Sequence, residues 1–199
     1  MTTIDIILGS SRTNAEGHKL FRYLENHAPV WVNSNEVTLR FMDIADYQLP
    51  LFNEDDAPMD NSHRQLTENE QRWLTALQQA DGYVILTPEY NHSFPAALKN
   101  GLDYVAYEMQ GKPVRILTYA PSARGGQFAF MALLPTLNQL GCFVLPKPTI
   151  IGRITQNFTV AGEMPTDAPA VAHYPERLKQ MVREIAFYGQ LFAENPFEG

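Results

Sequence analysis

The residues best suited to bind an anion follow the first apolar segment of the chain. Residues 9–17 read Gly-Ser-Ser-Arg-Thr-Asn-Ala-Glu-Gly, in which a glycine is followed by two serine hydroxyls, then an arginine and, after Thr13, an amide, all directly before a predicted helix. The free amides and the dipole at a helix start favour an anion, and the planar guanidinium of Arg12 can hold two phosphate oxygens. The segment has neither the dinucleotide glycine pattern nor the Gly-Lys-Ser/Thr ending of a P-loop. Helix capping alone, with Thr13 and Glu16 as a capping box, is the alternative interpretation.

A second candidate segment, residues 87–95, reads Thr-Pro-Glu-Tyr-Asn-His-Ser-Phe-Pro and follows another apolar run. A flat aromatic ligand could lie beside Tyr90 while nearby backbone amides meet its heteroatoms. Ser93 is placed to cap the next helix, and Pro95 is tolerated in the first turn of that helix. The alternative is an ordinary loop with a surface tyrosine, and His92 by itself indicates a solvated or structural imidazole.

The third candidate segment, residues 120–127, reads Ala-Pro-Ser-Ala-Arg-Gly-Gly-Gln. Paired glycines let a backbone approach a ligand closely or bend sharply. The pattern therefore indicates either a ligand contact or a tight turn between a strand and a helix.

The elements that would position these segments alternate between strand and helix. Continuous apolar runs predict strands buried on both faces of a parallel sheet at residues 4–8, 83–87 and 114–119, with further strands at 37–42 and 142–145. Thr67 and Glu70 form a capping box before a helix with apolar residues at helical spacing, and a second apolar stripe predicts a C-terminal helix at about 175–193. This alternation predicts an α/β doubly wound sheet, in which ligands bind beyond the carboxyl ends of the strands.

The length and composition fit one domain, residues 1–199, of an ordinary globular protein. One cysteine, Cys142, cannot form an internal disulfide, which fits a reducing compartment, and the first residues do not resemble a secretory signal. The net charge of −7 argues against non-specific nucleic-acid binding, and no apolar stretch approaches the roughly 20 residues of a membrane span. We therefore expect a cytoplasmic protein with no nucleic-acid or membrane partner. The sequence also has no His/Cys cluster with the spacing of metal ligands, so no metal is expected.

Taken together, residues 4–152 resemble the NADPH-dependent FMN reductase family. The resemblance rests on five motifs in order: Gly-Ser-x-Arg at 9–12, Leu-Pro-Leu-Phe-Asn-Glu-Asp at 49–55, Pro-Glu-Tyr-Asn-His-Ser at 88–93 running on to Leu-Lys-Asn at 98–100, Arg-Gly-Gly at 124–126, and Leu-Gly at 140–141 before Leu-Pro at 145–146. The part of the chain past Arg153 carries no such signature.

The resemblance implies a flavodoxin-like fold, a five-stranded parallel sheet in the order 2-1-3-4-5 with helices on both faces. It implies bound FMN, with NADPH or NADH as co-substrate and a small molecule (quinone, free flavin, azo compound or metal oxyanion) as electron acceptor. The phosphate would be held by Ser10, Arg12, Asn14, Gly17 and His18, and the isoalloxazine would be bordered by Pro88, Glu89, Tyr90, Asn91, Ser122, Gly125 and Gly126. On this account flavin N5 takes the hydride, and no side chain is an essential acid, base or nucleophile.

The resemblance also implies a homodimer or homotetramer, with residues 94–107 and the loop from Tyr47 among the contact surfaces. Two alternatives remain at this point. A non-enzymatic flavodoxin-like electron carrier would use the same sheet, although true flavodoxins hold phosphate without an arginine. A hydrolase or transferase without flavin is the other, and the sequence has no Gly-x-Ser-x-Gly elbow to support it.

Overall fold

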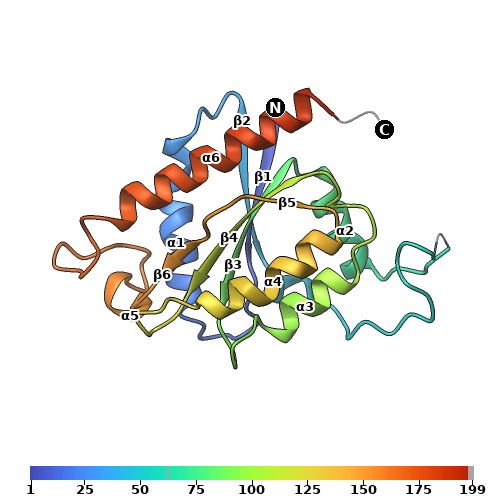
Figure 1. Cartoon of the computed structure of the whole chain (residues 1–199), viewed down its shortest axis with the longest axis horizontal. Helices are drawn as coiled ribbons and strands as arrows, with labels where there is room; N and C mark the ends of the chain where they lie inside the picture. Colours follow the sequence, from blue (N-terminus) through green and yellow to red (C-terminus); the bar gives the residue numbers. More distant parts are fainter. Residues whose placement is uncertain (62, 197–199) are drawn as a thin grey trace.

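The computed structural model describes residues 1–61 and 63–196, and its centre is a parallel β-sheet (Figure 1). Five strands follow the order β2-β1-β3-β4-β5, and β6 also pairs with β4. Their bounds are Thr2–Leu8 for β1, Val37–Asp43 for β2, Gly82–Pro88 for β3, Pro113–Tyr119 for β4, Phe143–Val144 for β5 and Thr149–Ile151 for β6. The predicted strand order is therefore confirmed. Strand order reverses beside β1, so the carboxyl ends of β1, β3 and β4 share one edge of the sheet.

The central strands β3 and β4 are buried along their whole length, and β1 is buried at all but one residue. This burial explains why their sequences are nearly continuous apolar runs. The acid inside the first run, Asp5, is fully buried and pairs with Arg40 of β2, which lies opposite it in register. Its carboxylate accepts from Arg40 Nε at 2.7 Å and from Arg40 Nη2 at 2.9 Å, so the buried charge is compensated.

Two layers of helices cover the sheet (Figure 1). Helices α1 (Gly17–His27) and α6 (Tyr174–Glu194) pack on one face, against Ile4, Ile6, Val84 and Leu86 among others. Helices α2 (Glu68–Gln79), α3 (Ala96–Asp103) and α4 (Gln127–Gln139) pack on the other face. The predicted capping box of α2 is present, since Thr67 and Glu70 bond reciprocally, and α6 matches the predicted C-terminal helix within one residue at each end.

The prediction of a single fifth strand is incomplete, because two short strands take its place. β5 pairs with the start of β4 at Pro113 and Val114, whereas β6 pairs with its end from Leu117 to Tyr119. Between them lie Pro146 and Pro148, which have no amide hydrogen to donate to a ladder. Lys147, between the two prolines, has a left-handed φ of 60°. The chain therefore leaves the sheet for four residues and returns as a sixth strand.

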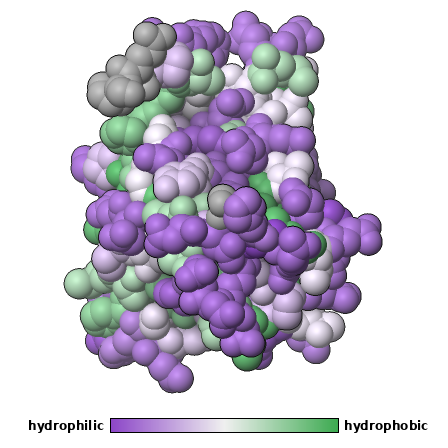
Figure 2. All heavy atoms as spheres, turned by 90° about the vertical axis from the view of Figure 1, so that its right-hand side faces the viewer, coloured by the Kyte–Doolittle hydropathy of each residue, from purple (hydrophilic) through white to green (hydrophobic). Residues whose placement is uncertain are grey.

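Three short helices lie in the remaining connections: η1 (Ala28–Trp31), η2 (Ile44–Tyr47) and α5 (Ile154–Asn157). The last lies past Arg153, in the part of the chain that carries no motif of the family. The side of the molecule that carries the loop after η2 is mainly hydrophilic, with small separate hydrophobic areas (Figure 2). Among the described residues, no helix combines the length and the apolar character that crossing a bilayer requires.

Candidate functional site

The loop after β1 presents its polar residues beyond the carboxyl end of the sheet. Ser10 is fully buried, whereas residues 11–14, which include Arg12 and Asn14, are exposed. Helix α1 begins at Gly17, and no described side chain caps its amides, so the predicted Thr13–Glu16 capping box is absent. Glu16 instead pairs with Lys19 at 2.7 Å, within the first turn of the helix. The amides of His18 and Lys19 donate to the Ala15 and Glu16 carbonyls at 3.1 Å. Among the described residues, the start of α1 therefore offers an anion the amide of Gly17 and the positive end of the helix dipole.

The loop after β3 closes on itself as a tight turn. The amide of Tyr90 donates to the Ser93 carbonyl at 2.8 Å, and the amide of Ser93 donates back to Tyr90 at 3.0 Å. Asn91 and His92 form the exposed tip with φ values of 50° and 63°, a left-handed conformation in which non-glycine residues are uncommon. The predicted cap by Ser93 is wrong, because α3 starts two residues later, with Pro95 at the N-cap position and no side-chain cap from any described residue.

The first two loops meet through their side chains. The hydroxyl of Ser10 lies 3.0 Å from the hydroxyl of Tyr90, and the guanidinium carbon of Arg12 lies 5.9 Å from the centre of the Tyr90 ring. These residues are about 80 positions apart in the chain. An arginine and an aromatic ring, the two side chains suited to a phosphate and a planar ring system, therefore lie together.

The loop after β4 is held close to the second loop by its glycines and by Glu89. Gly125 and Gly126 have φ values of 62° and 81°, and a Cβ on Gly125 would lie 2.4 Å from Ile150 of β6. The Glu89 carboxylate accepts from the amide of Phe128 at 2.9 Å, in the first turn of α4. A carboxylate at a helix N-terminus is favoured by the helix dipole. The loops after β3 and β4 are thus tied at the start of α4, and the paired glycines satisfy a close packing requirement.

A residue that the sequence analysis did not single out, Tyr119, lies beneath the first loop. A Cβ on Gly17 would lie 2.1 Å from the Tyr119 hydroxyl, so the side chain ends directly under the start of α1. The hydroxyl is buried and has no hydrogen-bond partner of normal geometry among the described residues. Burial raises the pKa of this phenol, with Tyr90 and Asp43 adding to the rise, whereas the nearby Ser10 hydroxyl and the charge of Arg12 lower it; the phenol stays a neutral donor. Its position as the last residue of β4 was the available sequence signal.

His18 has a different environment from the one that the resemblance implied. Its Nε2 lies 2.9 Å from a carboxylate oxygen of Asp43, at the end of β2, and its Nδ1 lies 3.2 Å from the Ala15 carbonyl. Asp43 also accepts from the amide of Ala45 at 2.9 Å. Both ring nitrogens of His18 are therefore engaged within the protein, and the imidazole braces the first loop against β2. Its predicted contact with a phosphate stays a prediction.

The motif at residues 49–55 is anchored to α3 by the asparagine of the Leu-Lys-Asn motif. Asn100 accepts from the amide of Phe52 at 2.8 Å and donates to the Pro50 carbonyl at 2.7 Å. A cleft of about 370 Å³ lies between this loop and the start of α3, and Ser11 of the first loop also lines it. The structure thus brings the second sequence motif to the same edge of the sheet as the other loops.

Among the described residues, no cluster of His, Cys, Asp and Glu could hold a metal ion. The geometry offers a helix start without a side-chain cap, with Arg12 beside it, the buried Tyr119 phenol beneath it and the Tyr90 ring next to it. This set of groups fits a phosphate attached to a planar ring system, and FMN is such a molecule.

Comparison with known proteins agrees with this arrangement. The model of the NADPH-dependent FMN reductase family matches residues 2–156. An NADPH azoreductase of a Bacillus species is 30% identical over 154 residues, which cover 76% of this chain and 78% of that protein. A quinone reductase of Pseudomonas putida is 30% identical over 160 residues, covering 75% of this chain and 78% of that protein.

Among solved structures, the flavoenzyme NAD(P)H:(acceptor) oxidoreductase of Paracoccus denitrificans has the same fold, with a TM-score of 0.74 and 23% identity over 96% of this chain and 98% of that one. The family model covers more than half of the chain and all five motifs that carry the resemblance. The chain therefore belongs to the NADPH-dependent FMN reductase family, and it is an FMN-dependent NAD(P)H oxidoreductase.

Proposed function

We propose that the FMN phosphate binds at the start of α1, held by Ser10, Arg12, Asn14 and the amides up to Gly17. The observation that carries this proposal is the convergence of Ser10, Arg12 and Tyr90 above the buried Tyr119 hydroxyl, which has no hydrogen bond of normal geometry to any described residue. A phosphate oxygen would satisfy that buried donor, which otherwise costs roughly 1–3 kcal/mol. We add Tyr119 to the residues proposed from the sequence.

The isoalloxazine then lies between the loops after β3 and β4. We propose Pro88, Glu89, Tyr90 and Asn91 on one side and Ser122, Gly125 and Gly126 on the other. The Glu89 carboxylate is already engaged by the amide of Phe128, so its part is to hold the two loops together. Backbone groups of these loops would therefore meet the ring heteroatoms.

When bound, FMN supplies the redox chemistry, since it accepts hydride from a nicotinamide and passes electrons on. The residues of the chain would orient the cofactor and stabilise its charge. Arg12 and the Gly17 amide at the start of α1 would fix one end of the cofactor, and preorganised backbone donors at the other end would favour negative charge on the ring. No side chain is needed as a nucleophile.

We propose a quinone or an azo compound as the electron acceptor. Relatives that are 30% identical to this chain are named quinone reductase and azoreductase, which supports these two classes. Both are flat conjugated molecules that could stack on an exposed ring.

The test is an absorbance spectrum of the FMN-loaded protein without oxygen, before and after one equivalent of NADPH. We expect NADPH to bleach the visible flavin band and a quinone or an azo dye to restore it. A protein that stays colourless after mixing with FMN would contradict the assignment. A flavin band that NADPH leaves unchanged would favour the electron carrier, for which direct oxidation of NADPH is not required.

We further propose that the protein is a cytoplasmic homodimer or homotetramer. Leu51 in the second motif and Tyr107 after α3 are 82% and 59% exposed, and they lie on the two segments that the resemblance implied as contact surfaces, which supports an interface there. The single buried thiol, Cys142, supports a reducing compartment. Light scattering of the FMN-loaded protein tests the assembly, and a monomeric mass would contradict it.

A further inference from the structure

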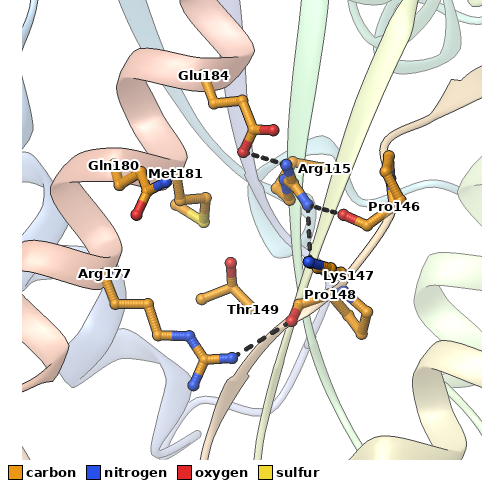
Figure 3. A pocket seen from close by; sticks show the side chains of 9 residues that line it. All are labelled: Arg115, Pro146, Lys147, Pro148, Thr149, Arg177, Gln180, Met181 and Glu184. Atoms are coloured by element: carbon orange, nitrogen blue, oxygen red, sulfur yellow. Dashed lines mark hydrogen bonds and ion pairs between the residues drawn. The ribbon is translucent and has the colours of Figure 1, made fainter.

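A second polar cleft lies on the α6 face of the sheet, at the break between β5 and β6 (Figure 3). It has a volume of about 420 Å³. Arg115 of β4 lies at its floor, Lys147 and Thr149 line one wall, and Arg177, Gln180 and Glu184 of α6 line the other. Arg115 lies in the middle of β4, whereas the proposed FMN residues lie beyond the carboxyl ends of the strands. The two sites are therefore separate.

Local sequence explains both walls of this cleft. Residues 177, 180 and 184 recur at helical spacing, so they share one face of α6. On the opposite wall, the prolines around Lys147 interrupt pairing with β4 and push the backbone away from the sheet. The interruption leaves space beside β4 that polar side chains line.

The floor of the cleft is an arginine that is only 3% exposed. Its Nη1 donates to the carbonyls of Pro146 and Lys147, the latter at 2.8 Å, and its Nη2 donates to the Glu184 carboxylate. Its Nε is buried and has no partner among the described residues. Among the described residues that line the cleft, Glu184 is the only acid, and its side chain is 37% exposed. It pairs with the buried guanidinium of Arg115 from the solvent-facing side of the cleft.

The cleft carries an excess of positive charge although the whole chain has a net charge of −7. It is lined by Arg115, Lys147 and Arg177 against the single carboxylate of Glu184. Lys147 and Arg177 are exposed and form no ion pair with any described residue. Within the described part of the chain, Arg177 donates only to the carbonyls of Ile150 and Pro148, at 3.3 and 3.5 Å. These contacts are long, so the guanidinium group can still bind a ligand. Clustered cations with a low-dielectric floor attract anions.

We propose that this cleft binds the phosphate group of a small phosphorylated metabolite. Arg177 and Lys147 would donate charge-assisted hydrogen bonds, and the Thr149 hydroxyl and the Gln180 amide would complete the set of donors. Figure 3 shows the Thr149 hydroxyl pointing into the space between Arg177 and the Arg115–Glu184 pair. The positive charge of Arg115, buried at the floor of the cleft, would attract the phosphate further. The site is independent of the FMN site and of the redox reaction.

The test is isothermal titration calorimetry of the FMN-loaded protein, in which the phosphate loop is already occupied, at constant ionic strength. Inorganic phosphate and glycerol 3-phosphate are the probes. We expect one phosphate per chain, and an affinity that falls roughly tenfold in Lys147→Gln and again in Arg177→Gln. Arg183→Gln is the matched control, because Arg183 is an exposed cation of α6 that does not line the cleft. No binding by the wild type, or equal affinity in wild type and both variants, would overturn the proposal.

Glu184→Gln gives a change in the opposite direction. It removes the only carboxylate that faces the ligand and leaves Arg115 without its acid partner, so we expect phosphate to bind severalfold more tightly. Unchanged or weaker binding by this variant would overturn the placement of the anion beside Arg115. Glycerol 3-phosphate should bind at least as tightly as inorganic phosphate, and an affinity about tenfold lower would overturn the assignment to a phosphate ester. Retained flavin colour shows that each variant is folded, which separates this test from that of the FMN site.

Discussion

Single residues at the carboxyl edge of the sheet divide into those that can reach a ligand and those that hold the loops. Arg12 is exposed and lies against Tyr90, whereas the His18 and Glu89 side chains are already bonded within the protein. A ligand contact is therefore expected of the first kind of residue, and loop geometry is expected to depend on the second.

Arg12→Ala should weaken FMN binding by roughly 10- to 100-fold, the range expected when a charge-assisted hydrogen bond to phosphate is lost. Quenching of flavin fluorescence during titration of the apoprotein measures this change. Arg72→Ala is the matched control, because Arg72 also lies over a tyrosine ring, at 5.2 Å from Tyr47, but on α2 away from the site. Equal FMN affinity in wild type and Arg12→Ala would contradict the phosphate role.

Tyr119→Phe should stabilise the apoprotein by about 1 kcal/mol, because it removes a buried hydroxyl that makes no hydrogen bond of normal geometry within the described part of the chain. The same change should weaken FMN binding, since the proposed phosphate bond is lost. Urea unfolding with and without FMN measures both effects. Tyr174→Phe should act in the opposite direction on the apoprotein, because the Tyr174 hydroxyl accepts from the Gly152 amide at 2.9 Å. A destabilised Tyr119→Phe apoprotein would show that the hydroxyl is already satisfied.

Cys142 gives a prediction about pH. Burial raises the pKa of its thiol from an ordinary value of 9.0 to about 12. Above pH 9 the unfolded chain loses this proton while the folded chain keeps it, so the thiol's contribution to the free energy of unfolding is complete below pH 9 and declines from pH 9 to about 12. Wild type should therefore lose more stability than Cys142→Ala when urea unfolding is compared at pH 8 and pH 10.5. Parallel losses in the two proteins would contradict this account.

At the scale of elements, helix α4 depends on a residue from another loop for its start. Gly126 precedes it with a φ of 81°, and no side chain of the neighbouring sequence caps it. The carboxylate that accepts from its first turn comes from Glu89, 39 residues earlier. The start of α4 and the loop after β3 are consequently one structural unit.

Glu89→Ala should lower the free energy of unfolding by about 1 kcal/mol, the usual cost of a lost helix cap, and Glu89→Gln by less, because an amide oxygen can still accept. Urea unfolding of the apoprotein measures the change. Glu68→Ala is the control, since Glu68 is an exposed acid in the first turn of α2, where Thr67 and Glu70 already provide the cap. If Glu89→Ala were as stable as wild type, the bond to Phe128 would contribute nothing.

At the scale of the whole molecule, FMN would bridge loops that follow three different strands. A ligand at 100 times its dissociation constant stabilises the folded state by about 2.7 kcal/mol, which for a chain of this length raises Tm by roughly 5–10 °C. Thermal unfolding of the apoprotein with FMN and with riboflavin measures the effect. Riboflavin at the same concentration should raise Tm less, because it lacks the phosphate. Equal Tm shifts with FMN and riboflavin would show that the phosphate contributes nothing to binding, which would contradict the proposed phosphate site.

The sequence by itself determined the sheet and the position of the site along the chain. Strands buried on both faces must be continuously apolar, so β1, β3 and β4 were recognisable, and the Thr67–Glu70 box is a local signal that needs no tertiary contact. The carboxyl ends of parallel strands lie at one edge, which was enough to bring the three loops together.

Only the tertiary structure decided what each polar side chain does at that edge. Glu89 accepts a hydrogen bond from α4, His18 bonds to Asp43, and the Tyr119 side chain ends beneath α1. Each contact joins segments that are distant in the sequence, so the local spacing of residues could not predict it. The split of the fifth strand has the same origin. The carbonyls of Pro146 and Lys147 lie outside the sheet, and Arg115 of the neighbouring strand β4 donates hydrogen bonds to both. The break therefore depends on a tertiary contact that satisfies these buried groups.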